Sequence, residues 1–328
     1  MAGLAAGLGT WLAMAATAGA AEGVPSSWER AFPKTDFDKH AVAYESILSG
    51  GVPKDGIPSI DDPRFVPAKQ RTDWLSPKEP VIGLSINGDA RAYPLRVLTW
   101  HEIVNDTVGG RPVAVTYCPL CNSAMVFDAK VDGQRLSFGT TGKLRKSDLV
   151  MYDRQTESWW QQFTGKAIVG DQVGTKLRVL PSRLESWNEF LDRHPDGKVL
   201  VPNNPDMRDY GRNPYAGYDT RENPMLYRGP MPDKMPAMGR VVVVGEEAWD
   251  LRLLREKKRI ESGDLILTWR SGQTSALDAG SIPKGRDVGS VVVRRKTADG
   301  VEDVPYEVTF AFVFKAFHPE GTWHVKQG

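Results

Sequence analysis

Cys118 and Cys121 are the two cysteines of the chain, and they are separated by Pro119 and Leu120. Two thiols at this spacing can cycle between the dithiol and the disulfide. Two thiolates are also half of a tetrahedral zinc set, or most of a Cu(I) site. The third interpretation is a quiet local disulfide or a pair of buried thiols. Because the pair closes almost no chain, stabilisation alone explains it poorly.

For a metal site, the further candidate ligands are His101 and Met125. Met125 follows Cys121 by four positions, and His101 comes from the segment before the strand that leads into Cys118. We expect copper before zinc, because sulfur ligands helped by an imidazole suit Cu(I). The alternatives are a core histidine bonded to a backbone group and an ordinary strand methionine.

Thiol–disulfide exchange through Cys118 and Cys121 is the rival hypothesis. In thioredoxin-like proteins the Cys-x-x-Cys begins a helix, whose N-terminus lowers the thiol pKa. Here the residues that follow, 124–127, are β-like, so the pattern indicates no such helix. A third hypothesis is a non-enzymatic binding or scaffolding module with quiet cysteines. Whether the chain is an enzyme stays open.

The elements that position the pair are predicted to be short. Residues 113–117 have the β-branched and aromatic content of a strand that runs into Cys118. Earlier, residues 81–86 and 90–93 predict two strands joined by a turn at Asn87-Gly88. A helix is predicted from about Leu95 to Val104, with His101 on its apolar face.

A polar cluster of Glu102, Asn105 and Asp106 follows His101. One interpretation is general acid–base chemistry or contact with a hard ion. The other is capping of the helix end and turn formation, which we favour for Asn105 and Asp106. A second helix is predicted after a capping box of Ser182 and Glu185.

The chain contains an apparent internal repeat. Residues 116–125 can be aligned with 268–277, and residues 88–98 with 245–254. In this alignment Arg270 and Gln273 stand where the first copy has its two cysteines. The fold would then not need the cysteines, as expected of a site added to a scaffold. The alternative is chance similarity between two β-rich segments.

These observations predict a β-rich α+β protein of two related halves, an internal duplication, with a few short helices. The predicted organisation is a signal peptide at 1–21, an extended Pro-rich lead-in at 22–80, a first half with the cysteines at 81–201, a connecting loop at 202–236 and a second, degenerate half at 237–328.

The N-terminal segment predicts export. Residues 1–21 have no charged side chain and end in Ala18-Gly19-Ala20-Ala21, a small-residue pattern that suits signal peptidase. We expect cleavage near Ala20-Ala21 and a periplasmic or secreted protein. A retained membrane anchor is the alternative. No later stretch approaches a membrane span, so none is expected in the mature chain.

Composition limits the partners. The formal net charge is +1 and the basic residues are scattered, so we expect no nucleic-acid binding. Residues 139–143 resemble a phosphate loop but lack its first Gly and its Ser or Thr, so we expect no nucleotide. The long loop 202–236, rich in Pro, Asn, Gly and Tyr, is the predicted contact for a protein or small molecule.

Three motifs together resemble the bacterial family called domain of unknown function 3179. They are residues 100–106, 116–121 and 149–156, and the resemblance covers most of the chain after about residue 60. Members of this family are typically exported or membrane-attached. The resemblance implies the domain and carries no established activity.

Overall fold

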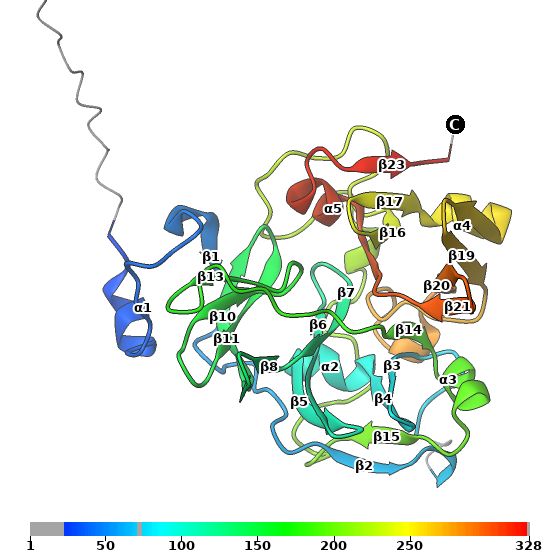
Figure 1. Cartoon of the computed structure of the whole chain (residues 1–328), viewed down its shortest axis with the longest axis horizontal. Coiled ribbons are helices and arrows are strands. Elements are labelled where there is room, and N and C mark those ends of the chain that lie inside the picture. The colour runs from blue at the N-terminus through cyan, green and yellow to red at the C-terminus, as the bar shows by residue number, and fades with distance from the viewer. Residues whose placement is uncertain (1–22, 71–73, 327–328) are drawn as a thin grey trace, which may run out of the picture.

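Short strands separated by turns make up most of the regular secondary structure, as the β-branched and aromatic runs of the sequence predict. The structure is a computed structural model that describes residues 23–70 and 74–326, so the predicted signal peptide lies outside the described residues. The described part contains five short α-helices and 23 strands. Its five larger sheets form a propeller-like ring, which confirms a β-rich fold with a few short helices (Figure 1).

The cysteines lie in a three-stranded meander that follows a hairpin and a short helix. The elements of this part are β3 (Pro80–Ile86), β4 (Asp89–Pro94), α2 (Leu95–His101), β5 (Ile103–Val108), β6 (Arg111–Cys118), β7 (Ser123–Asp128), β14 (Arg183–Ser186), α3 (Trp187–Arg193) and β15 (Lys198–Val201). β14 pairs antiparallel with β3, and β15 pairs parallel with β4. β2 (Arg64–Pro67) completes the outer edge of this sheet.

The second part of the chain has a similar order of elements, with β21 as an additional strand. They are β16 (Arg240–Val244), β17 (Glu247–Asp250), α4 (Leu251–Lys257), β18 (Arg259–Ser262), β19 (Leu265–Arg270), β20 (Ser290–Thr297), β21 (Gly300–Asp303), β22 (Glu307–Phe310), α5 (Ala311–Phe317) and β23 (Thr322–His324). β22 pairs antiparallel with β16, and β23 pairs parallel with β17. These pairings match those of β14 and β15 in the first part.

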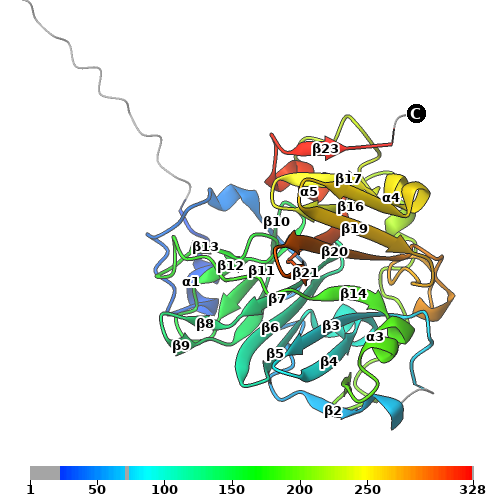
Figure 2. The ribbon, with the colours of Figure 1, turned by 45° about the vertical axis from the view of Figure 1, so that its right-hand side comes forward.

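Each of the two parts contributes one strand that packs against a strand of the other part. β14 lies against β20, and β22 lies against β7. Figure 2 shows β14 beside β20 and β21. One apolar cluster contains Leu84 and Val115 of the first part together with Val242, Trp249 and Leu267 of the second. The ring therefore closes around a core that both parts share.

The strand register corrects the predicted alignment near the cysteines. Cys118 ends β6 opposite Ser123, and Arg270 ends β19 opposite Ser290. Arg270 and Cys118 therefore occupy similar positions at the ends of their strands. The predicted match of Gln273 with Cys121 is wrong, because the second part connects its strands through the longer segment 271–289.

A further sheet has no counterpart in the second part. Its strands, and the small ribbon beside it, are β1 (Ile47–Ser49), β10 (Phe138–Arg145), β11 (Asp148–Asp153), β12 (Trp159–Gln161), β13 (Lys166–Val169), β8 (Lys130–Val131) and β9 (Gln134–Arg135). The lead-in also contributes α1 (Ser26–Ala31). Phe32, Tyr152 and Trp159 pack edge to face beneath it. This sheet carries the turn that reaches the cysteines.

The helix predicted at 95–104 ends earlier, at His101. Glu102 has a φ of 57° and stops the helix. The β-branched residues that follow then pair with β6 as strand β5. Asn105 and Asp106 therefore belong to a strand, and their side chains make hydrogen bonds to neighbouring strands. Arg91 donates to both oxygens of Asp106 at 2.7 Å, and Asn105 exchanges two hydrogen bonds with the backbone of Phe138, both 2.8 Å.

The capping box of α3 is shifted from its predicted place. Ser186, not Ser182, caps the helix. In return, the Glu189 carboxylate accepts a hydrogen bond from the Ser186 backbone N–H. The motif Ser-x-x-Glu occurs twice in this segment. Residues 183–186 form β14 against β3, so the helix can begin only after them.

We expect Ser186→Ala to lower the free energy of unfolding by about 1 kcal/mol, because one helix N–H loses its acceptor. Urea unfolding followed by circular dichroism measures this. Ser182→Ala is the matched control and should change stability by less than about 0.5 kcal/mol. The reverse order of effects would contradict the observed cap.

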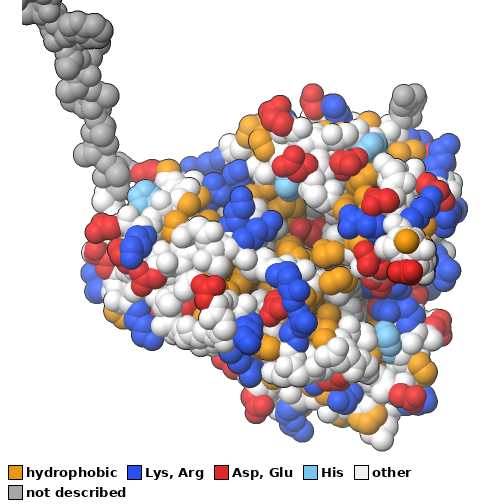
Figure 3. Space-filling model, in the orientation of Figure 1, with side chains coloured by type: hydrophobic (Ala, Val, Ile, Leu, Met, Phe, Trp, Pro, Cys, Tyr) orange, Lys and Arg blue, Asp and Glu red, His pale blue; other side chains and the backbone are white. Residues whose placement is uncertain are grey.

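The described surface shows no single-sign field on the face seen in Figure 3, where Lys and Arg side chains are interspersed with Asp and Glu. Among the described residues, no helix is both long enough and apolar enough to cross a membrane.

Candidate functional site

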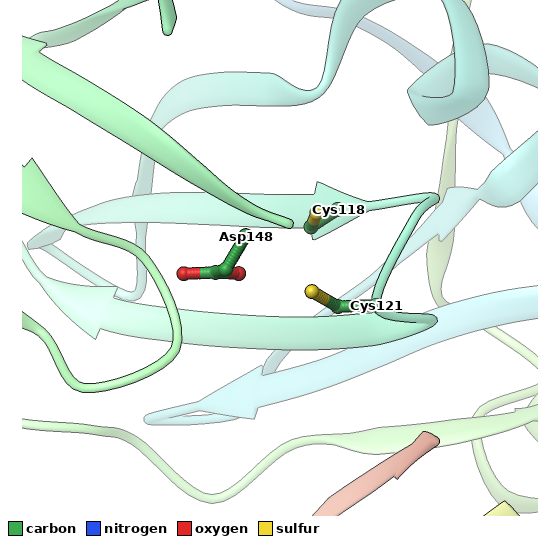
Figure 4. Close-up of side chains that lie close together, drawn as sticks. All are labelled: Cys118, Cys121 and Asp148. Atoms are coloured by element: carbon green, nitrogen blue, oxygen red, sulfur yellow. The ribbon is translucent and has the colours of Figure 1, made fainter. Parts of the chain in front are cut away.

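The Cys-Pro-Leu-Cys segment forms the tight connection between β6 and β7. The backbone N–H of Cys121 donates to the carbonyl of Cys118 at 3.2 Å, and Asn122 N–H donates to Pro119 at 3.2 Å. Proline fixes its own φ near the value such a turn needs, and Asn122 takes a φ of 51°. The turn brings both sulfur atoms to the same side of the hairpin (Figure 4).

A second hairpin, from the extra sheet, meets these sulfurs. Lys146 and Ser147 have φ values of 56° and 67° and form the turn between β10 and β11. The carbonyl oxygen of Ser147 lies 3.8 Å from Cys118 Sγ and 3.5 Å from Cys121 Sγ. Asp148, the next residue, places its carboxylate beside both.

Cys118, Cys121 and Asp148 form the candidate site. A carboxylate oxygen and the two Sγ atoms all lie within 4.8 Å of one another. Figure 4 shows the carboxylate beside the two sulfurs, with one of its oxygens on their side. The exposed fractions are 1% for Cys118 and 0% for both Cys121 and Asp148. The group is thus closed to bulk solvent in this conformation.

Asp148 is held at one oxygen and unpartnered at the other. Its Oδ2 accepts hydrogen bonds from Gln161 Nε2 at 2.6 Å and from the Phe163 backbone N–H at 2.9 Å. Its Oδ1 is buried and has no hydrogen-bond partner among the described residues. A buried carboxylate oxygen without a partner is costly unless the group is protonated or meets a cation.

Burial sets the protonation of the site. It raises the pKa of Asp148 to about 7, against the opposing effect of the bonds from Phe163 and Gln161. Burial also raises the pKa of the Cys118 thiol, and it raises that of Cys121 well above its ordinary value. The thiols are therefore protonated at neutral pH and weak as nucleophiles.

Glu102 is a further titratable group near the two thiols and Asp148. Its side chain is 7% exposed, and burial, followed by the charge of Asp148, raises its pKa to about 8. Its charge in turn raises the pKa of Cys118. Within the described part of the chain, no ion pair includes Glu102 or Asp148. Full ionisation of the site would thus leave several negative charges without an ion-pair partner among the described residues.

The predicted ligands His101 and Met125 lie differently. His101 Nδ1 is 2.8 Å from the carbonyl of Pro58, and its Nε2 is 2.8 Å from the Tyr210 hydroxyl. His101 is not a member of the thiol–carboxylate group. Met125, 3% exposed in β7, packs in the same apolar cluster as the cysteines.

Asp148 was not among the residues singled out from the sequence. A local signal existed, since Asp148 stands directly before an apolar run, residues 149–152, where burial of a carboxylate demands a reason. Its approach to the cysteines depends on the pairing of β10 with β11 and on how that sheet meets the meander. No spacing in the sequence encodes that contact.

The segment 202–236 covers the site. The Tyr218 hydroxyl donates to the carbonyl of Leu120 at 3.0 Å, and Ser147 Oγ donates to the carbonyl of Met225 at 2.7 Å. Tyr218 itself is 2% exposed. Both hairpins of the site are therefore tied to this segment, which keeps solvent from the sulfurs.

Comparison with known proteins gives one family. The family described as "Protein of unknown function (DUF3179)" matches residues 54–321. No curated protein and no solved structure matches the chain.

Proposed function

The chain belongs to the DUF3179 family of unknown function, and we propose that it binds one divalent metal ion through Cys118, Cys121 and Asp148. Zn²⁺ is the metal that this donor set suits. Two thiolates and one carboxylate supply three of the four ligands of a tetrahedral zinc site. Glu102, whose charge acts on Cys118 and Asp148, is the fourth candidate.

Zinc replaces copper as our first choice because of the third ligand. Cu(I) prefers thiolate, thioether and imidazole, whereas a carboxylate oxygen is a harder donor that zinc accepts readily. His101 has both ring nitrogens within hydrogen-bond distance of Pro58 and Tyr210, which favours Asp148 over the imidazole as the third ligand. Copper remains the comparison metal in the experiment below.

The observation that carries this proposal is the unpartnered Oδ1 of Asp148 beside two buried thiols. Without a metal, the three groups are accommodated by staying protonated. A bound cation would displace those protons and satisfy the free oxygen, which is the coupling expected of a metal site.

Metal titration of the reduced protein tests the proposal. We expect one equivalent of Zn²⁺ to bind in competition with a chromophoric chelator, and Co²⁺ to give the absorption of a tetrahedral thiolate complex. Cu(I) is titrated in parallel under anaerobic conditions. Failure of all three metals to bind stoichiometrically would refute the proposal, and exclusive binding of Cu(I) would refute the choice of zinc.

Thiol–disulfide exchange is the second candidate, favoured by the turn itself. The bond from Cys121 N–H to the Cys118 carbonyl closes a four-residue turn, whose Cα separation below about 7 Å overlaps the range for disulfides. Asp148, with a pKa of about 7, is placed to accept a thiol proton. Two S–H bonds would break and one S–S bond form, while a glutathione disulfide takes two electrons and the two protons to become two thiols.

Equilibration of the metal-free protein with glutathione buffers tests this candidate. Reversible loss of two thiols, at a potential within the range of those buffers, would support it. A disulfide with a reduction potential below roughly −300 mV would act as a structural bond and would contradict a role in thiol–disulfide exchange.

We also propose that residues 81–201 and 237–328 descend from one duplicated unit, as the sequence alignment predicts. The matched order of elements and the matched parallel and antiparallel pairings support this. Aligning the first halves of many family members into a profile tests it, since that profile should detect their second halves. A profile that detects only first halves would count against duplication.

Export remains part of the proposal. The uncharged, small-residue composition of residues 1–21 supports it. N-terminal sequencing of the protein recovered from the periplasm or medium should place the cut near Ala20-Ala21.

A further inference from the structure

A cavity of about 250 Å³ lies between the two parts of the chain, where β14 and α3 face β19 and β20. Four arginines line it, and they are Arg183, Arg193, Arg270 and Arg294. We propose that this cavity binds a small oxyanion or carboxylate, held by the guanidinium groups of Arg270 and Arg294. This site is separate from the cysteines and does not rest on the metal proposal.

Two of the arginines are fixed by carboxylates. Arg183 donates from Nε at 3.0 Å and from Nη2 at 2.7 Å to Asp303, which is outside the cavity lining. Arg193 donates from Nε to Glu185 at 3.0 Å. These bonds hold the two side chains in place as the wall formed by β14 and α3.

The other two arginines are uncommitted. Among the described residues, Arg270 and Arg294 make no hydrogen bond and no ion pair with another side chain. A planar guanidinium offers paired N–H donors that match the oxygens of a phosphate or carboxylate. Both side chains project from one sheet face, since Ser290, Val292 and Arg294 alternate along β20 and all line the cavity.

The acidic groups of the cavity are already bonded. Glu185 accepts from Arg193, and burial raises the pKa of Glu185. Glu189 accepts from the Ser186 backbone N–H at 3.1 Å and from the Ser290 hydroxyl of β20, and Asp192 accepts from Asn188 at 3.2 Å. Each carboxylate of the lining therefore has a bonded partner, and none of them pairs with the guanidinium groups of Arg270 and Arg294.

The position of Arg270 adds an independent argument. Arg270 ends β19 opposite Ser290, as Cys118 ends β6 opposite Ser123. Each residue also sits where its own meander meets the other part of the chain, since β14 packs on β20 and β22 packs on β7. Corresponding strand ends thus carry a thiol in one part and a guanidinium group in the other.

Isothermal titration of the full chain with inorganic phosphate, sulfate and malonate tests the proposal and separates oxyanions from carboxylates. We expect 1:1 binding of at least one of them. Arg270→Ala combined with Arg294→Ala should weaken it by roughly 10-fold to 100-fold, since each charge-assisted bond is lost.

Arg295→Ala is the matched control. Arg295 is the next residue of β20, lies on the opposite face and pairs with Asp264 at 2.9 Å. It should leave anion affinity unchanged, and urea unfolding should show that all variants are folded. No binding by the wild-type protein, or an equal loss in Arg295→Ala, would overturn the site. Cys121→Ser should retain anion binding, so this result is independent of the metal site.

Discussion

Cys121→Ser should weaken zinc binding by about 1,000-fold, and Asp148→Asn by about 100-fold. Zinc-finger peptides bind their metal with roughly 10–16 kcal/mol through four ligands, so each ligand contributes roughly 2.5–4 kcal/mol, which corresponds to about 100-fold to 1,000-fold in affinity. Serine keeps the size of cysteine but is a poor ligand at neutral pH. Asparagine keeps the bonds from Gln161 and Phe163 but loses the charge of Asp148.

Met125→Leu and His101→Gln are the controls for this experiment. Both residues were predicted as ligands, and the proposed zinc set of Cys118, Cys121 and Asp148 does not include them. Each should change the dissociation constant of zinc by less than about threefold, because a volume-conserving substitution leaves the site intact. A loss in Met125→Leu as large as that in Asp148→Asn would restore the sulfur-rich site. Unchanged affinity in Cys121→Ser would exclude the cysteines altogether.

The metal-free protein should lose stability as the pH rises from 6.5 to 8. Burial raises the pKa of Asp148 to about 7 and that of Glu102 to about 8, above their ordinary values. In this range the folded protein holds protons that the unfolded chain has released, so folding becomes less favourable as the pH increases. At about 1.4 kcal/mol per pH unit and group, the loss is on the order of 2 kcal/mol.

Urea unfolding at several pH values, in the presence of a chelator, measures this slope. The window begins at 6.5 because His101 and His318 have lowered pKa values and act in the opposite direction below it. The double variant Glu102→Gln with Asp148→Asn should have a shallower slope, and the remainder is expected from Glu307, whose pKa burial also raises well above its ordinary value. With zinc bound the slope should reverse, since the metal competes with protons. A wild-type slope that is flat or rising without metal would contradict the protonated state of the site.

Local signals in the sequence predicted local structure well. Asn87-Gly88 predicted a hairpin, and Ile86 pairs with Asp89 across that turn. The start of α2 at Leu95 was also confirmed, but its end was wrong because the helix competes with the β5–β6 pairing. The two Ser-x-x-Glu motifs near α3 are equally good caps by sequence alone. The pairing of residues 183–186 with the distant strand β3 determines which of them begins the helix.

The candidate site could be predicted only in part, because some of its residues come together through contacts that are distant in the sequence. The Cys pair is local, so its spacing alone placed both thiols together. The third member, Asp148, arrives from a sheet inserted after β7, and the cover arrives from segment 202–236. The prediction of His101 rested on its nearness in the sequence, which does not fix the direction of a side chain, and its ring nitrogens lie beside Pro58 and Tyr210.

The reciprocal packing of the two parts has a mechanical consequence. β14 of the first part packs against β20 of the second, and β22 of the second part packs against β7 of the first. Neither part can therefore bury its apolar surface alone. We therefore expect cooperative denaturation in one step, without an intermediate that keeps one part intact. A chain nicked within 202–236 should stay associated, and the separated fragments should recover their structure only when mixed. The thiol hairpin would then be ordered only in the reconstituted complex, because Asn122 Nδ2 donates to the carbonyl of Val308 across the seam at 3.0 Å.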